Sequence, residues 1–180
     1  NERSWPQSAY RMTFVSNHDK NAWDGTQHEQ FGEALDACIA LSVIGEGMPL
    51  IHNGQEAGEN KRLAFFERDP IEWQDHETGD LYRELIALKK SKGVLGNGEF
   101  GARMTQVPNS KMDKVFSFVR HNEHEKVFVI INFSQEAVNV TFEEPLFEGE
   151  YCYWKGSATC KFSSQTTLEL GPWQFDIWVA

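Results

Sequence analysis

The period of the hydrophobic pattern changes near the middle of this 180-residue chain. In residues 1–95, apolar residues recur at helical spacing, and two short strand-like runs occupy residues 11–15 and 48–52. In residues 96–180 the pattern alternates with a period of two, in short runs separated by polar turns. The chain is therefore expected to fold as two domains of different class that meet between residues 95 and 96.

The first half predicts a strand, a helix and a second strand. Thr26 and Glu29 form a capping box at the expected start of the helix. The apolar face of this helix consists of Phe31, Leu35, Cys38 and Ile39. This order predicts a right-handed parallel βαβ unit. Because a parallel sheet is normally covered on both faces, two strands are expected to be part of a larger sheet.

A long irregular stretch, residues 55–76, precedes a second predicted helix. The apolar face of that helix carries Leu81, Leu85 and Leu88. Its last turn holds Lys89 and Lys90, which are favourable beside the negative end of the helix dipole. The first half thus alternates strands with helices throughout.

The second half predicts an antiparallel β-sandwich of about 85 residues. Its clearest strand-like runs are residues 115–119, 127–133, 137–142 and 173–179. In the last of these, Trp173 is expected to be buried on the same face as Phe175, Ile177 and Val179. Two of the three cysteines, Cys152 and Cys160, flank a turn and could face each other across a hairpin, so a disulfide there stays open.

The charge balance excludes one class of partner. With 17 Lys and Arg against 27 Asp and Glu, the net charge is −10, which would repel the phosphate backbone of nucleic acids. No apolar run approaches the roughly 20 residues that a membrane span needs. The cysteine spacing does not match a metal site. A neutral ligand such as a sugar is compatible with this chain, although acidity alone does not select one.

The first chemical signal is the segment that ends the first strand-like run. Asn17, His18 and Asp19 follow it directly, at the end of a barrel-type strand where active sites form. Adjacent His and Asp side chains can hydrogen-bond two hydroxyls of one sugar ring, and an ionised Asp can stabilise an oxocarbenium cation. For these three residues in isolation, a simple turn with Asp19 capping a backbone N–H is the better explanation.

The second signal lies one helix later. Residues 47–56 have the pattern Gly-x-Pro-x-Ile-x-x-Gly-x-Glu, and residues 14–19 have the pattern Phe-x-x-Asn-His-Asp. In order, spacing and the β-rich segment that follows, these patterns resemble the closing strands of the α-amylase family, glycoside hydrolase family 13. The resemblance implies the C-terminal fragment of a (β/α)8 TIM barrel, with strands 7 and 8, followed by a Greek-key β-sandwich known as domain C.

The resemblance also implies roles for single residues. Asp19 matches the catalytic carboxylate that stabilises the transition state, and His18 matches the histidine that binds sugar in the cleavage subsite. Glu56 matches a position that supports the loop, and His52 receives no role. Lys61 and Arg62 resemble positions that often touch sugar in outer subsites, although a solvated loop charge is at least as good an explanation. Trp154 and Trp178 could stack on a glucan, but packing is favoured.

The nucleophile and the acid/base of the resembled family have no counterpart in the chain. The family places them after barrel strands 4 and 5, so the chain alone is expected to be inactive and its full-length parent to be a retaining hydrolase of starch or malto-oligosaccharides. The alternatives are a transglycosylase and a non-catalytic carbohydrate-binding or partner module. No cofactor is expected in this chain; calcium is common in the family and would lie upstream.

Two expectations concern the surroundings of the protein. An incomplete barrel should associate with itself or with absent upstream segments, because it exposes both faces of a small sheet. Residues 65–73 are similar to bacterial amylase members, which favours starch over sucrose or trehalose as the substrate. A bacterial protein that is secreted or periplasmic is slightly favoured. The compartment stays open.

Overall fold

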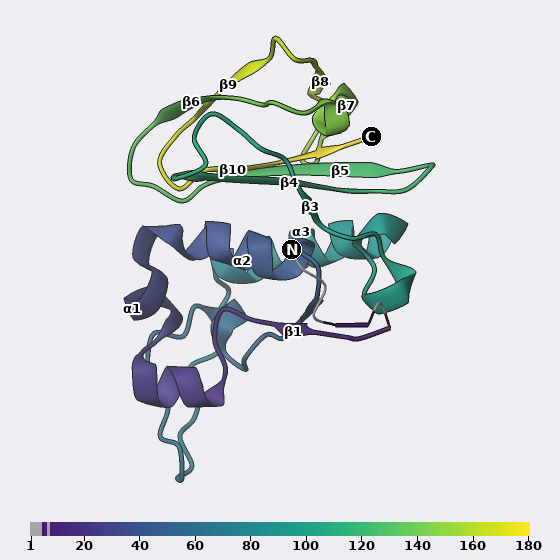
Figure 1. Ribbon diagram of the computed structural model, residues 1–180. Coiled ribbons are helices and arrows are strands. Elements are labelled where there is room, and N and C mark those ends of the chain that lie inside the picture. The colour runs from purple at the N-terminus through teal and green to yellow at the C-terminus, as the bar shows by residue number, and fades with distance from the viewer. Residues whose placement is uncertain (1–4, 7) are drawn as a thin grey trace. The chain divides into compact units, whose positions relative to one another are not determined.

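The computed structural model describes residues 5–6 and 8–180 and divides into two compact units (Figure 1). Unit 1 is Asn1–Ser91 and unit 2 is Lys92–Ala180. Helices dominate unit 1 and antiparallel strands dominate unit 2. This change from helix-rich to strand-rich structure is the one that the spacing of apolar residues predicts.

Unit 1 contains the predicted parallel strand pair. β1 (Met12–Thr13) pairs with β2 (Met48–Pro49), with Met12 opposite Met48 and Thr13 opposite Pro49. Both strands are shorter than the runs that predict them. Each has one partner strand among the described residues, so the ladder bonds that would extend it on the other side are missing.

The segment between these strands is helical but interrupted. It contains a π-helix η1 (Lys20–Asp24), α1 (Gln27–Phe31), a 3₁₀ turn η2 (Gly32–Ala34) and α2 (Leu35–Ile44). The single helix expected here is therefore broken at Gly32, whose φ of 50° lies in the left-handed region. In α2 burial extends beyond one stripe, because Ala37, Ile39, Ala40, Val43 and Ile44 are all inaccessible.

The remaining elements of unit 1 follow the predicted order. A 3₁₀ turn η3 (Gln55–Ala57) and an irregular loop lead into α3 (Glu77–Ser91). Leu81 and Leu85 of α3 are buried as expected, whereas Leu88 is half-buried. None of the described residues form a helix long and apolar enough to cross a membrane.

Unit 2 is a sandwich of two antiparallel sheets, which confirms the fold expected for the second half. The larger sheet has the strand order β3-β4-β5-β10-β7-β8 and the smaller one pairs β6 with β9. Two 3₁₀ turns, η4 (Gly93–Leu95) and η5 (Gly98–Phe100), precede them, and a third, η6 (Pro145–Phe147), follows β6. The strands are β3 (Thr105–Gln106), β4 (Val115–His121), β5 (Lys126–Asn132), β6 (Val138–Thr141), β7 (Gly149–Tyr153), β8 (Thr159–Phe162), β9 (Thr167–Leu170) and β10 (Phe175–Val179).

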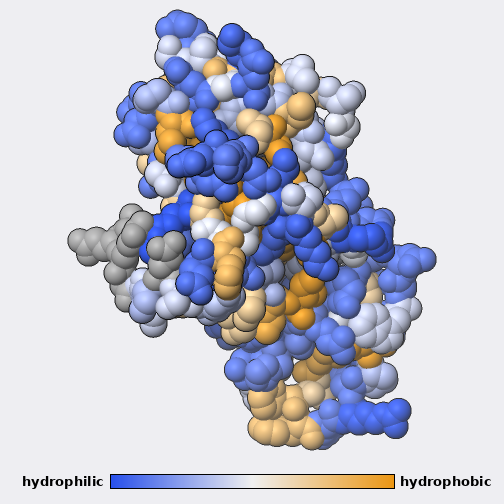
Figure 2. Space-filling view, turned by 90° about the vertical axis from the view of Figure 1, so that its right-hand side faces the viewer, coloured by the Kyte–Doolittle hydropathy of each residue, from blue (hydrophilic) through white to orange (hydrophobic). Residues whose placement is uncertain are grey.

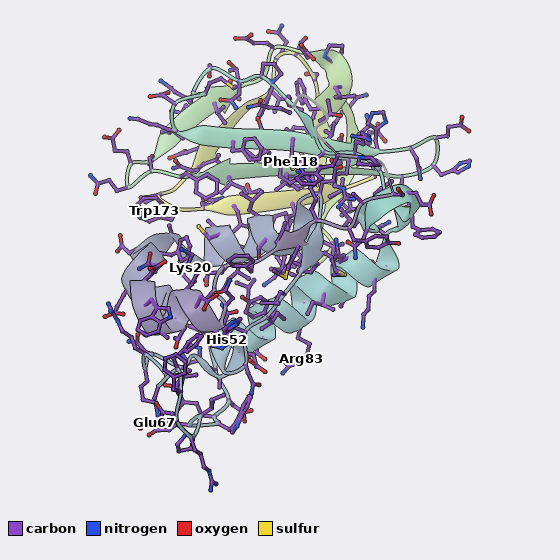
Figure 3. All side chains as sticks on the ribbon, turned by 60° about the horizontal axis from the view of Figure 1, so that its bottom comes forward. Lys20, His52, Glu67, Arg83, Phe118 and Trp173 are labelled. Carbon is purple, nitrogen blue, oxygen red and sulfur yellow. The ribbon has the colours of Figure 1, made fainter. Side chains whose placement is uncertain are left out.

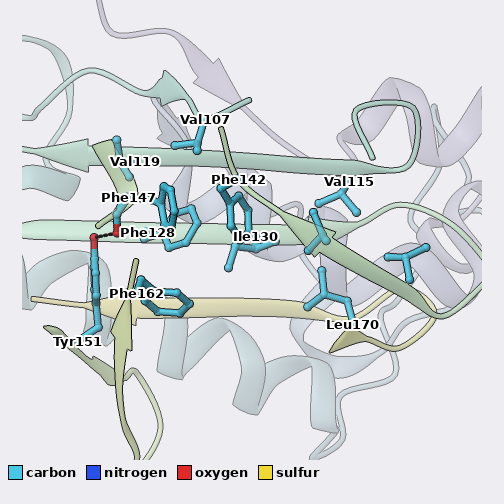
Figure 4. Packing of buried hydrophobic residues seen from close by; sticks show 12 residues of the cluster. Val107, Val115, Val119, Phe128, Ile130, Phe142, Phe147, Tyr151, Phe162 and Leu170 are labelled. Atoms are coloured by element: carbon cyan, nitrogen blue, oxygen red, sulfur yellow. Dashed lines mark hydrogen bonds between the residues drawn. The ribbon is translucent and has the colours of Figure 1, made fainter. Parts of the chain in front are cut away.

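The core of the sandwich is aromatic and lies between the two sheets (Figure 4). Phe128 of β5 is central: its ring contacts those of Phe142, Phe147, Tyr151 and Phe162 at centroid distances of 5.2–6.3 Å. The Tyr151 hydroxyl donates to the Phe147 carbonyl at 2.8 Å, so this buried polar group is satisfied. Val138, Val140 and Leu170 of the smaller sheet belong to the same cluster.

Trp173 is not part of the last strand, which corrects the prediction. It lies in a turn with φ of 55° and is half-buried, and β10 begins only at Phe175. Pro172 cannot donate to a ladder, and the Gly171 N–H is taken by Gln174 Oε1 at 2.8 Å. These local bonds close a turn where alternation alone predicts strand.

The three cysteines are free thiols. The predicted hairpin between β7 and β8 is present, but its register pairs Cys160 with Tyr151 and Cys152 with Thr159. Since neighbours along a strand face opposite sides, Cys152 and Cys160 point to opposite faces of the sheet. The register therefore excludes the disulfide that the sequence leaves open.

Candidate functional site

The segment after β1 turns sharply and leaves two side chains in solvent. The Asn17 side chain accepts a hydrogen bond from the Lys20 N–H at 2.8 Å, and the Asn17 carbonyl accepts one from the Asn21 N–H at 2.9 Å. Asp19 occupies the N-cap position of η1 but its side chain makes no capping bond. The turn therefore depends on Asn17, which removes the simple capping explanation for Asp19.

His18 and Asp19 lie together and are open to a ligand. Their side chains are 70% and 59% exposed, and His18 Nε2 is 3.7 Å from Asp19 Oδ2. The pair presents one imidazole and one carboxylate on the same side of the turn. Such a pair can bind two neighbouring hydroxyls, and the carboxylate can stabilise a positive charge nearby.

The end of β2 lies close to the same turn, as the parallel pairing predicts. Burial lowers the pKa of His52, and the nearby His18 lowers it further. The His52 N–H donates to Gln55 Oε1 at 2.6 Å, and the Gln55 amide donates to Gln27 Oε1 at 3.1 Å. Figure 3 labels Lys20, at the start of η1, and His52 in this part of unit 1.

Glu56 supports the loop that follows β2. Its Oε2 accepts a hydrogen bond from the Gly54 N–H at 3.1 Å. Gly54 has φ of 97° and is buried against Ile71 and Glu59, so a side chain there would be strained. Glu56 thus stabilises a tight turn, which is the role expected of it.

Lys61 and Arg62 are both engaged in ion pairs of unit 1. Lys61 Nζ donates to Asp69 Oδ1 at 2.7 Å and to the Pro70 carbonyl at 2.9 Å. Arg62 Nε donates to Glu29 Oε2 at 2.8 Å, and this bond is the main reason that the pKa of Glu29 is lowered. Their contact with sugar stays a prediction, and their contacts here hold the loop that begins at Lys61.

Four residues of this region make contacts that no local sequence pattern predicts. Asn21 is 6% exposed and joins η1 to the loop: its amide donates to the Lys61 carbonyl at 3.1 Å and accepts from the Leu63 N–H at 2.8 Å. The other three are the aromatic cluster, which we define as Trp23, Phe65 and Phe66. Phe65 lies 5.7 Å from the His18 ring, so the cluster begins at the candidate site.

The two tryptophans of unit 2 that could stack on sugar pack within that unit instead. Trp178 is half-buried between Tyr153 and Phe162, at centroid distances of 5.1 and 5.3 Å, and its indole N–H is buried. Trp154 is also half-buried, 6.2 Å from Phe175, and the Lys155 ammonium lies 4.6 Å from its ring centre. Packing accounts for the position of both rings.

Side chains that bind metal ions are carboxylates for hard cations such as calcium, and imidazoles or thiolates for transition metals. In the part of the chain that the structure describes, no three His, Cys, Asp or Glu side chains gather in a way that could hold a metal ion.

The comparisons with known proteins point to one class. A family model described as "Alpha-amylase SusG C-terminal domain" matches residues 115–174, which lie in the sandwich of unit 2. Alpha-amylase 2 of Dictyoglomus thermophilum is 28% identical over 165 residues, and Alpha-amylase MalA of Haloarcula japonica is 27% identical over 158. These matches cover 82% and 83% of this chain.

The solved structures agree on the fold. The maltogenic α-amylase AmyB from Thermotoga neapolitana superposes with a TM-score of 0.77 and 22% identity, over 97% of this chain and 42% of that one. The cyclomaltodextrin glucanotransferase CldA gives a TM-score of 0.73 and 20% identity, over 97% of this chain and 37% of that one. The resemblance to the α-amylase family is thereby confirmed in sequence and in fold.

The chain spans only part of these proteins. It corresponds to 27% of Alpha-amylase 2 and 23% of Alpha-amylase MalA. This chain therefore matches about a quarter of the length of each curated relative.

Proposed function

We propose that this chain is the C-terminal part of a retaining α-glucan hydrolase of the α-amylase type that acts on starch or malto-oligosaccharides. One observation carries the proposal: Asp19 is exposed beside His18 at the end of a parallel strand, and its carboxylate makes no capping bond. This carboxylate does not stabilise its own turn by a capping hydrogen bond, so it is available to bind a ligand. The amylase names of the curated relatives support the substrate class.

In this proposal Asp19 and His18 handle the sugar at the point of cleavage. The ionised carboxylate of Asp19 accepts hydrogen bonds from sugar hydroxyls and stabilises the oxocarbenium-like transition state. His18 binds a neighbouring hydroxyl and orients the ring. Unit 1 is the end of the catalytic barrel, with β1 and β2 as its seventh and eighth strands.

Retaining cleavage needs two further carboxylates about 5–5.5 Å apart, one as nucleophile and one as acid/base. We place both in the part of a longer protein that precedes this chain, since the relatives are about four times as long as the region they share with it. The 180-residue chain alone is then inactive.

Replacing one charge-stabilising group tests the role of Asp19. In the longer protein, Asp19→Asn should lower kcat on starch by about 10²–10³-fold, the usual loss for one such group. Asp75→Asn is the matched control, because Asp75 is an exposed carboxylate in the loop of unit 1 before α3. Near-normal turnover by the Asp19 variant would overturn the assignment.

The products of the same assay separate the hydrolase from the two alternatives. A hydrolase releases only shorter malto-oligosaccharides, whereas a transglycosylase also forms products longer than its substrate. A non-catalytic module would bind starch and release nothing. Chromatography of the products from maltoheptaose distinguishes the three.

A further inference from the structure

The aromatic cluster of Trp23, Phe65 and Phe66 is unusually exposed. Trp23 is 60%, Phe65 38% and Phe66 85% exposed. Figure 2 shows hydrophobic side chains at the lower end of unit 1, where the loop before α3 lies in Figure 1. Single exposed apolar residues are ordinary, but a contiguous group rimmed by polar residues is typical of a binding site.

The rings form a continuous path that starts at the candidate site. The His18 and Phe65 rings are 5.7 Å apart, and Phe65 and Trp23 are 5.4 Å apart. Phe66 lies 4.8 Å from Phe65 and 6.5 Å from Trp23. A ligand that contacts His18 would therefore meet these rings next.

The cluster is held by bonds on both of its sides. Trp23 lies in η1, which Asn21 joins to the Lys61 carbonyl and the Leu63 N–H. Across the loop, Asp69 binds Lys61 Nζ at 2.7 Å and the Ala64 N–H at 2.9 Å. These bonds fix the segment that carries Phe65 and Phe66, so little ordering entropy remains to be lost on binding.

We propose that Trp23, Phe65 and Phe66 stack on a second pyranose ring of the α-glucan, next to the ring that Asp19 and His18 hold. This inference rests on the proposed function. A pyranose has an apolar face of C–H groups and a polar edge, which suits aromatic faces with charged groups beside them. Asp19 and the Lys20–Asp24 ion pair supply that polar border. A neutral sugar also suits an acidic chain better than an anion does.

Binding can be measured on the 180-residue chain without any turnover, by tryptophan fluorescence during titration with maltoheptaose. Trp23→Ala should remove most of the fluorescence change, because it removes the reporting indole as well as a stacking face. Trp73→Ala is the matched control: Trp73 is also 60% exposed in unit 1 and is not part of the cluster.

Phe66→Ala retains the Trp23 indole as the fluorescent reporter and removes one ring of the aromatic cluster. It should raise the Kd for maltoheptaose by about 3–10-fold, the range expected for one aromatic contact. Its control is Phe100→Ala, since Phe100 is 72% exposed but lies in unit 2. Kd values that are the same for both phenylalanine variants would overturn the inference, as would no fluorescence response to maltoheptaose.

Three further outcomes separate this inference from the proposed function and from self-association. If the longer protein cleaves starch and its KM for maltoheptaose is unchanged by Phe66→Ala, the stacking surface is wrong and the proposed function stands. If the chain binds maltoheptaose through Trp23 but the longer protein cleaves nothing, the stacking surface is supported and the proposed hydrolase is wrong. If Phe66→Ala abolishes self-association and leaves the Kd for maltoheptaose unchanged, the cluster is a contact between copies and the inference fails.

Discussion

Asn17, His18 and Asp19 have separate roles within one short turn. Asn17 accepts the Lys20 N–H and directs the chain into η1, while the two following side chains stay in solvent. Because the turn is already satisfied by Asn17, a substitution of Asp19 should change chemistry far more than folding. This separation is what makes Asp19→Asn an informative variant.

Asp176 of β10 should make the stability of the fold depend on pH. Burial raises the pKa of its carboxyl, although Gln174 Nε2 donates to Oδ1 at 3.1 Å and opposes this rise. Between the ordinary and the raised pKa the folded state holds more protons than the unfolded state, so stability falls as pH rises through this range. Asp176→Asn should therefore be more stable than the native chain at pH 7, and this gain should vanish below the ordinary pKa.

Urea unfolding at neutral and at acid pH measures this difference. Asp113→Asn serves as the control, because Asp113 is exposed in a turn of unit 2 and should show no gain at either pH. An Asp176 variant that is less stable than the native chain at pH 7 would mean that the ionised carboxylate is favourable where it lies.

Single residues differ in how far the sequence predicts them. The positions of His18, Asp19 and Glu56 after the parallel strands can be predicted, because each belongs to a local pattern that follows a strand-like run. Trp23 and Phe65 cannot, since they are 42 positions apart and meet only through the folding of a loop without periodicity. The ion pairs of Lys61 and Arg62 are likewise invisible, because their partners lie in segments without a shared pattern.

At the scale of elements, the N-terminus of α1 is the clearest agreement between sequence and structure. The Thr26 hydroxyl accepts from the Glu29 N–H at 3.2 Å, and Glu29 Oε2 accepts from the Thr26 N–H at 2.8 Å. Thr26 is 2% exposed and its hydroxyl also donates to Asn60 Oδ1 at 2.6 Å. One side chain thus caps α1 and joins it to the loop beyond β2.

Thr26→Ala should lower the free energy of unfolding by about 0.5–2 kcal/mol, the range typical of N-cap residues. The helical circular dichroism signal during urea unfolding reports the change. Thr26→Ser keeps the hydroxyl and should recover most of the loss. Equal stability of the alanine variant and the native chain would show that the capping box contributes nothing in this fold.

Element boundaries are harder to predict than element types. The patterns identify α3 and the strand pair, but β1 and β2 contain two residues each where five are expected. Strand length depends on hydrogen bonds from neighbouring strands, which local sequence does not contain. The same limit explains Trp173, where alternation continues although local bonds close a turn.

At the scale of the whole molecule, the small parallel sheet of unit 1 exposes apolar side chains. Met12 and Met48 are opposite each other in the register and are 51% and 44% exposed. A short strand pair whose outer edges have no partner strand among the described residues, and whose faces are apolar, favours contact between chains. We therefore expect the 180-residue chain to self-associate at micromolar concentration.

Size-exclusion chromatography with light scattering measures the mass of the protein in solution and checks this expectation. Replacing both Met12 and Met48 by Glu should shift the chain toward the monomer, because charge opposes burial of this face. Met112→Glu is the control, since Met112 is 51% exposed in unit 2. A native chain that is monomeric at every concentration contradicts the expectation.

Asp19 is proposed to act together with a nucleophile and an acid/base that lie in the longer protein. The most direct test is hydrolysis of starch by the purified 180-residue chain beside the longer protein, with both scored for new reducing ends. Activity is expected in the longer protein alone. Starch hydrolysis by the chain itself, free of the longer protein, would contradict the role proposed for Asp19, because the nucleophile and the acid/base would then lie among these residues.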